Sequence, residues 1–233
     1  LKRFKAPKKN INKDLLKKNI KKIYSVLRNS SRPVILLGGG VKIAKVQNNI
    51  NKFLKKLDVP VVTTWSGVDI LDHDNRNYIG NVGVYGSRAA NFAVQNSDFL
   101  LCLGSRLDTR ITGGVPSSFA RNAKIISVDI DKHELSKKRG LKLFLKINSN
   151  LSDFFYMIDK ENKKFEYKNS TWLNKCVNWK KKYPIVKDEY YSQKKYVNPY
   201  VFINELSKIL DKKSVVIADD GGHLTWTIQS FKV

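Results

Sequence analysis

The chain of 233 residues is 42% hydrophobic, which suits one good-sized domain with appendages, or about one and a half domains, and none of its apolar runs approaches the ~20 residues of a membrane span. The formal charge of +24 suggests a nucleic-acid partner, but no lysine lies between Leu57 and Ala123, the stretch richest in motifs, so we expect no nucleic-acid binding. Two separate cysteines and three scattered histidines exclude a disulfide framework and a metal-ligand spacing, and they favour a reducing, cytoplasmic location without a signal peptide.

The first part of the chain begins to alternate between helix and strand. A polar, basic linker is expected up to Asn12, and apolar residues at helical spacing predict a helix from Asp14 to Leu27. Residues 34–37 form a continuous apolar run, typical of a strand buried on both faces, and Gly38-Gly39-Gly40 follows directly. An amphipathic helix is then expected from Ile43 to Leu57.

The alternation continues to about residue 160. The expected elements are strands at residues 59–63, 99–103, 125–128 and 141–147, a helix from Ser87 to Gln95, and a helix that Asn150 caps. Strands that alternate with helices predict an α/β fold, a doubly wound, Rossmann-like parallel sheet covered by helices on both faces.

The last third of the chain looks different. A Lys-rich linker is expected at 161–169, a helix that Ser170 caps, an irregular stretch, and a helix from Asn198-Pro199 to Leu210. Val215 to Ala218 predicts another buried strand, followed by Asp219-Asp220-Gly221-Gly222-His223. Because one strand and one helix cannot bury a core alone, we expect a truncated second α/β domain and therefore a piece of a longer protein.

These elements predict four segments. They are a linker and helix from a preceding domain at 1–30, a central dinucleotide-binding-like domain at 31–160, a linker at 161–198, and the start of a second α/β domain at 199–233.

Two candidate sites follow the first two predicted strands. Gly39 and Gly40 lie between a strand and a helix, where a phosphate can bind a helix N-terminus, but a tight turn with positive φ would also explain them. The Thr64 hydroxyl can bond ribose or phosphate oxygens, or it can belong to a plain polar loop.

Two further candidate sites follow later strands. Arg106 and Arg110 suit phosphate or the edge of a flavin, with a surface ion pair to Asp108 as the alternative. Asp129 and Asp131 can accept hydrogen bonds from ribose hydroxyls, while the same spacing also occurs in metal-dependent glycosyltransferases. The neighbouring glycines and arginines favour a dinucleotide.

His223 follows Gly221 and Gly222 at the expected start of a helix, where an anion binds well. The alternative is a capping histidine without a ligand. No Ser-His-Asp set, catalytic cysteine setting or glutamate pair is evident in the sequence, so these candidates bind ligands and do not themselves carry out catalysis.

Taken in chain order, these residues resemble the acetolactate synthase branch of the thiamine-diphosphate enzymes. The resemblance covers about Arg32 to Leu151 and Pro199 to Phe231. Its most specific stretch is Ser97–Gly113, and further matching stretches are Val59–Thr64, Gly80–Gly86, Lys124–Asp131 and Val216–His223. Two departures stand out, because Val84-Tyr85-Gly86 occupies the place of a usual Met-His-Gly, and Gly222 occupies the place of a usual Gln.

The resemblance implies decarboxylation of a small 2-oxo acid such as pyruvate and its ligation to a second carbonyl compound, with thiamine diphosphate and Mg²⁺ in the full-length enzyme. It places FAD, where retained, at Gly39, Gly40, Thr64, Arg106, Arg110, Asp129 and Asp131, and thiamine diphosphate at Gly221, Gly222 and His223. The two departures leave open whether FAD is kept and whether the substrate belongs to branched-chain amino-acid or surface-sugar synthesis.

The resemblance also implies a homodimer or homotetramer. The family's activating glutamate and its Gly-Asp-Gly metal motif have no counterpart in residues 1–233, so we expect no catalytic or metal-binding residue here and no activity from this piece alone. The alternative function is a nucleotide- or NAD-binding module of the same topology without thiamine chemistry.

Overall fold

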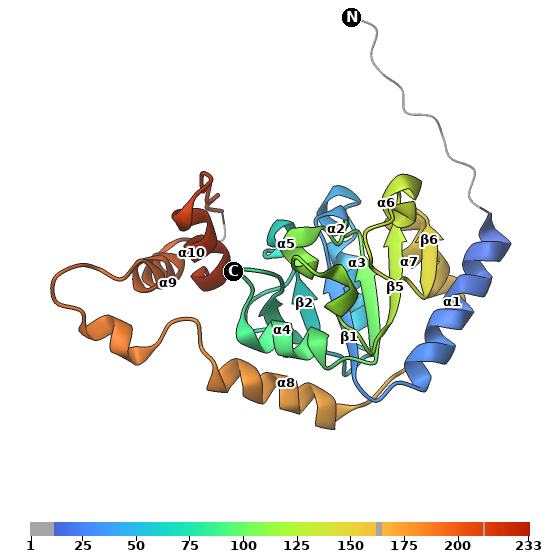
Figure 1. Ribbon diagram of the computed structural model, residues 1–233, viewed down its shortest axis with the longest axis horizontal. Coiled ribbons are helices and arrows are strands. Elements are labelled where there is room, and N and C mark those ends of the chain that lie inside the picture. Colours follow the sequence, from blue (N-terminus) through green and yellow to red (C-terminus); the bar gives the residue numbers. More distant parts are fainter. Residues whose placement is uncertain (1–11, 162–164, 212) are drawn as a thin grey trace, which may run out of the picture.

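The computed structural model describes residues 12–161, 165–211 and 213–233, and Figure 1 shows their arrangement. The expected linker before Asn12 therefore lies outside the described residues, as does part of the one at 161–169. Six strands form one sheet in the order β3-β2-β1-β4-β5-β6, and every neighbouring pair is parallel. The strands are β1 (Pro33–Leu37), β2 (Val61–Thr63), β3 (Tyr78–Asn81), β4 (Phe99–Leu103), β5 (Lys124–Asp129) and β6 (Leu145–Asn148). This confirms the predicted doubly wound α/β fold.

Helices cover both faces of the sheet. One face carries α1 (Lys13–Arg28), α2 (Gly40–Ile43), α3 (Gln47–Leu54) and α7 (Leu151–Glu161), and the other carries α4 (Arg88–Gln95), α5 (Thr109–Thr112) and α8 (Ser170–Lys182). Successive side chains of a strand point to opposite faces, so Ile35 and Leu37 join the first layer while Val34 and Leu36 join the second. All four are at most 1% exposed, as expected for a strand buried on both sides.

Side-chain caps that the sequence analysis did not identify start two of the predicted helices. The Asn12 side chain accepts a hydrogen bond from the Leu15 N–H at 2.9 Å, and Ser87 does the same for the Ala90 N–H at 3.2 Å. Helix α1, which we expected to belong to a preceding domain, packs on α7, and its apolar stripe lies in the core of the first layer.

The prediction of a single helix from Ile43 to Leu57 is wrong. It is divided into α2 and α3, because Lys45 adopts a left-handed conformation with φ of 56°. Because of this break, Val46 packs in the core while Ile43 is 86% exposed. The sequence pattern had placed both residues on the same apolar face of one helix.

Strand β3 was not predicted at all. It is short, and Gly80 interrupts its apolar pattern with a φ of 138°. Its pairing with β2 shifts register between Val61 and Val62, so the edge of the sheet is irregular here. The strand expected at residues 141–147 is also shorter than predicted, since β6 begins at Leu145.

Helix α8 is part of the central core. Its cap is Asn169 and not Ser170, because the Asn169 side chain accepts from the Trp172 N–H at 3.2 Å. The Trp172 indole donates to Pro33 O at 3.0 Å across the buried second layer. Leu173 and Cys176 are fully buried beside it. Part of the segment that we expected to be a linker therefore packs on the sheet.

The chain after α8 forms α9 (Pro199–Ile209) and α10 (Gly222–Ser230), which pack on each other beside the sheet (Figure 1). The buried strand expected at Val215–Ala218 is wrong: Val215 is 84% exposed and Ile217 is 90% exposed. A strand needs a neighbour for its backbone N–H and C=O groups, and no described strand lies beside this segment. Among the described helices, none combines the length and apolar character required to cross a membrane.

Two short helical elements complete the region of interest. Helix α6 (Lys132–Ser136) follows β5, and a single 3-10 turn, Trp65–Gly67, follows β2. Both lie at the carboxyl end of the sheet, next to the candidate site.

Candidate functional site

The turn after β1 and the turn after β4 pack against each other at the centre of the sheet. The Gly38 N–H donates to Leu103 O at 2.9 Å, and the Gly40 N–H donates to Gly104 O at 3.0 Å. A Cβ on Gly38 would lie 2.2 Å from Gly104 O, so glycine is needed because two backbones meet here. The alternative based on positive φ is wrong, since none of Gly38, Gly39 and Gly40 adopts it. Strand order reverses between β1 and β4, and ligands bind parallel sheets at such switch points.

Gly39 and Thr64 lie at the ends of the neighbouring strands β1 and β2. The Thr64 N–H donates to Leu37 O at 2.9 Å, which ties the two strand ends together. A Cβ on Gly39 would lie 2.8 Å from the Ser66 Cβ, so the β2 loop closes over the glycine turn. Helix α2 has only four residues, and its dipole adds little to anion binding. Close backbone approach, and not helix charge, is what the glycines provide.

Arg110 lies against an aromatic pair, Trp65 and Tyr85, that the sequence analysis did not predict. Its guanidinium is 5.3 Å from the centre of the Trp65 ring, and the Tyr85 ring lies 5.6 Å from Trp65. The Trp65 indole Nε1 is buried and has no hydrogen-bond partner among the described residues. Arg110 thus belongs to a cation–aromatic stack over the ends of β2 and β3, and the surface ion pair with Asp108 is not formed.

Arg106 and Asp129 lie at the ends of the adjacent strands β4 and β5. Arg106 is exposed, while the Asp129 carboxyl is half-buried and accepts the Asp131 N–H at 2.8 Å. Burial raises the pKa of Asp129 above its usual range, and the positive charge of Arg106 opposes this shift. Asp131 has a local role, because its side chain accepts from the His133 N–H at 2.8 Å and caps α6. Of the two acids, Asp129 is the one placed to meet a ligand hydroxyl.

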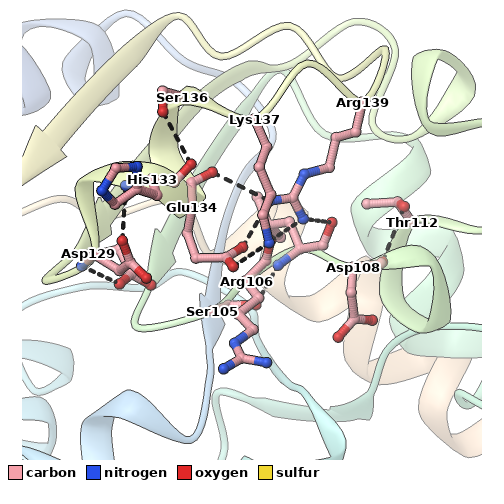
Figure 2. A network of polar contacts seen from close by, with 12 residues as sticks. Ser105, Arg106, Asp108, Thr112, Asp129, His133, Glu134, Ser136, Lys137 and Arg139 are labelled. Carbon is pink, nitrogen blue, oxygen red and sulfur yellow. Dashed lines mark hydrogen bonds and ion pairs between the residues drawn. The ribbon is translucent and has the colours of Figure 1, made fainter.

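Arg139 fixes the loop that carries Arg106, as Figure 2 shows. Its guanidinium donates to Arg106 O at 2.7 Å and to Glu134 Oε2 at 2.8 Å. It also donates to Leu107 O at 3.2 Å, which supports the left-handed Leu107 with φ of 51°. The Arg106 side chain points away from this network and remains available. Sequence reasoning missed Arg139, because it lies in a polar lysine-rich run that carries no periodic signal.

These contacts show which predicted residues share a site. The carboxyl edge of the sheet carries Gly39, Gly40, Thr64, Arg106, Arg110 and Asp129 on neighbouring strand ends. A close glycine turn, an exposed guanidinium and a half-buried acid suit the phosphates and ribose of a dinucleotide. The arrangement therefore fits FAD, with Asp131 acting as a helix cap beside it.

Gly221, Gly222 and His223 lie apart from that group, at the N-terminus of α10. Gly221 has a φ of 135°, and no side chain caps the helix, so its first N–H groups lack a side-chain acceptor. His223 is exposed. A nine-residue helix with a glycine entry and uncapped N–H groups fits a diphosphate, while the exposed run before it forms no sheet edge.

Comparison with known proteins gives a consistent result. Residues 20–153 match the family model described as thiamine pyrophosphate enzyme, central domain. The acetolactate synthase large subunit of Cyanidium caldarium is 34% identical over 93% of this chain and 37% of its own length. The probable acetolactate synthase large subunit of Methanococcus aeolicus is 32% identical over 92% of this chain and 37% of its own length. The acetolactate synthase large subunit of Lactococcus lactis is 27% identical over 91% of this chain and 36% of its own length. The chain thus spans a little over a third of these relatives.

Proposed function

The chain belongs to the thiamine-pyrophosphate enzymes related to acetolactate synthase large subunits, and we propose that it works in an acetolactate-synthase-like enzyme. The proposed reaction removes CO₂ from a 2-oxo acid such as pyruvate and joins the remaining two-carbon unit to a second carbonyl compound. One observation carries the proposal over a plain nucleotide-binding module: a match over 93% of the chain is too long to stop at residue 198, so it extends through α9, beyond the central domain.

The residues of α10 are assigned to the diphosphate end of the cofactor. Thiamine diphosphate supplies the carbanion chemistry when bound. In this proposal the N–H groups that follow Gly221 and Gly222 bind the diphosphate, and the His223 imidazole adds one hydrogen bond. Mg²⁺ accompanies the diphosphate, and no ligand for it is assigned within residues 1–233.

The carboxyl edge of the sheet is assigned to FAD. Arg106 would pair with a phosphate, the Asp129 carboxyl would accept a ribose hydroxyl, and the backbone near Gly39 would approach the diphosphate closely. The stack of Trp65, Tyr85 and Arg110 offers an aromatic surface for a flat ring beside it. Arg139 acts here as a positioning residue, since it contacts the Arg106 loop.

Location and assembly are part of the same proposal. A cytoplasmic location fits the two free, buried cysteines, Cys102 and Cys176, which have no need of an oxidising compartment. The homodimer or homotetramer is proposed from the family resemblance. The pathway, branched-chain amino-acid or surface-sugar synthesis, depends on the identity of the second carbonyl substrate.

The direct test is an assay of the complete protein with thiamine diphosphate, Mg²⁺ and pyruvate. We expect CO₂ release together with acetolactate, detected after acid conversion to acetoin. Replacement of pyruvate by longer 2-oxo acids then defines the substrate range. If the complete protein releases no CO₂ from any 2-oxo acid, the proposed function is wrong.

A further inference from the structure

One side-chain contact joins the two regions that are assigned to different cofactors. The Gln229 side chain on α10 donates a hydrogen bond from Nε2 to the backbone oxygen of Tyr85. Tyr85 lies in the turn between β3 and α4, at the carboxyl end of the sheet. Because the acceptor is a backbone atom, the contact holds the turn itself and does not depend on the tyrosine side chain. Helix α10 therefore touches the edge of the sheet to which FAD is assigned.

The turn that Gln229 contacts is part of the aromatic stack beside the proposed FAD site. The rings of Tyr85 and Trp65 lie 5.6 Å apart, and the Arg110 guanidinium is 5.3 Å from the centre of the Trp65 ring. The Val84 N–H also donates to Arg110 O at 2.8 Å, so the turn and Arg110 are joined through their backbones as well. A displacement of the turn would therefore move the Tyr85 ring and Arg110 together.

The other end of α10 carries the proposed diphosphate site. Gly221, Gly222 and His223 lie at its N-terminus, and Gln229 follows about 9 Å further along the helix axis. Ser230 is the buried residue of α10, and the helix packs more extensively on α9 than on β3. Few contacts thus hold α10 against the sheet, and such lightly packed elements shift or open most easily. The Gln229 hydrogen bond is one of these contacts, and it lies on the same helix as the diphosphate site.

We propose that Gln229 is a positioning residue through which thiamine diphosphate and FAD strengthen each other's binding. When the first turn of α10 binds the diphosphate, the helix is held in place, and Gln229 near its other end holds the Tyr85 turn. The aromatic stack is then already ordered when FAD binds.

The physical basis of the coupling is conformational entropy. A ligand that binds to a region already ordered by another ligand loses less of this entropy, and the coupling between the two ligands is positive. Coupling between binding sites is reciprocal, so FAD strengthens thiamine-diphosphate binding by the same factor. The inference rests on the proposed function, because it takes both cofactor sites from it.

The test is a flavin fluorescence titration of the complete protein after both cofactors have been removed. FAD is added once without thiamine diphosphate and once with saturating thiamine diphosphate and Mg²⁺. We expect the dissociation constant of FAD to be about fivefold lower, or lower still, when thiamine diphosphate is present, since coupled sites typically differ by this factor or more. An FAD affinity that stays the same or becomes weaker would overturn the proposal.

Gln229→Met separates a positioning role from a structural one. Methionine keeps the approximate length of the side chain but removes the N–H donor, so FAD should bind this variant equally well with and without thiamine diphosphate. Gln95→Met, which replaces an exposed glutamine at the end of α4, is the matched control and should keep the full coupling. A general loss of stability would weaken the protein without removing the ratio of the two FAD affinities. If Gln229→Met keeps that ratio, Gln229 does not link the sites and the proposal is wrong.

The same titrations distinguish this inference from the proposed function. If both cofactors bind but neither changes the affinity of the other, the coupling is wrong and the proposed function stands. If thiamine diphosphate binds and FAD does not, the coupling and the flavin site are both wrong, while the thiamine chemistry stands. If thiamine diphosphate does not bind to the complete protein, the proposed function and the coupling are both overturned.

Discussion

Two segments of the chain carry similar patterns, yet only one of them is a strand. Residues 34–37 lead into Gly38-Gly39-Gly40, and residues 215–218 lead through two aspartates into Gly221-Gly222. The first segment is β1, which pairs with β2 on one side and β4 on the other. The second lies exposed, with no described strand beside it. An apolar run therefore predicts the capacity to form a strand, whereas neighbouring strands decide whether it does so.

Helices α8 and α9 repeat this contrast. Both begin at a capping asparagine, and both have an apolar face. Helix α8 buries Trp172 at 4% exposure, but α9 leaves Phe202 at 56% and Ile209 at 80%. The core of the central domain thus extends through α8, beyond the boundary at residue 160 that the sequence suggested.

The sharpest way to test this boundary is to remove one aromatic side chain from each helix. Trp172→Ala deletes a buried indole and its hydrogen bond to Pro33 O, and should lower the free energy of unfolding by about 3–5 kcal/mol. Phe202→Ala, at an exposed position, should change it by less than about 0.5 kcal/mol. Urea unfolding measures both values. Similar losses for the two variants would place the boundary elsewhere.

The glycine turn of β1 provides the next largest effect. Gly38→Ala forces a Cβ against Gly104 O, a backbone atom that cannot move without shifting β4, and should cost about 1–3 kcal/mol or more. Gly114→Ala is the control, since a Cβ there meets nothing within 4 Å. Unfolding midpoints in urea compare them. Equal stability of the two variants would mean that the β1 and β4 turns are not in contact.

Much of the central domain could be predicted because its signals are local. The buried runs of β1 and β4 and the caps Asn150 and Asn198 all lie where the sequence indicates. The failures have a common cause in contacts between distant residues. The Arg139 guanidinium contacts Arg106 O, 33 residues away, and neither this bridge nor the left-handed Lys45 leaves a periodic trace in the sequence.

The candidate sites divide in the same way. Strand ends predicted the location of Arg106 and Asp129, since the carboxyl ends of parallel strands share one edge. The sequence could not show that Asp131 caps α6, or that Trp65 lies under Arg110. Both facts depend on loop conformation, which neither composition nor spacing determines.

The proposed FAD site offers a test within the well-packed region. Arg106→Ala removes a charged hydrogen-bond donor and should weaken FAD binding by about 1–3 kcal/mol. Arg121→Ala, another exposed arginine with no assigned role, is the control. Flavin fluorescence titration of the complete protein measures both. Unchanged affinity for the Arg106 variant would remove this residue from the site.

The proposed diphosphate site offers the matching test in the α10 region. His223→Ala should weaken thiamine-diphosphate binding about tenfold, or about 1.4 kcal/mol, with FAD affinity unchanged. His133→Ala is the matched control, because His133 is also an exposed histidine in the first turn of a helix. Tryptophan fluorescence quenching in the complete protein reports the affinity. Equal binding by both variants would assign His223 to a structural role.

The smallest expected effect is a pH dependence of the protein's stability, caused by Lys180 where α8 and β3 meet the chain after α10. Burial lowers the pKa of Lys180 from 10.5 to about 8 in the folded protein. The groups around it are His73 and Asp74 before β3, Tyr78 on β3, and Lys232 after α10. His73 does not interfere, because burial also lowers its pKa from 6.5 and it titrates at lower pH.

Proton linkage gives the direction in which Lys180 changes the stability with pH. Below about pH 8 Lys180 is charged in both the folded and unfolded states, and the full cost of burying the charge is present. Between about 8 and 10.5 the unfolded chain binds more protons at Lys180, so the contribution of Lys180 to stability should rise with pH as this cost disappears. The urea midpoint of Lys180→Met should therefore fall relative to that of Lys181→Met as the pH is raised across that range, because only the second variant keeps the Lys180 contribution. If Lys180→Met and Lys181→Met show the same pH slope, the Lys180 ammonium of the unchanged protein is well solvated. The contact between β3 and the chain after α10 would then be as open to water as the exposed run at 215–218.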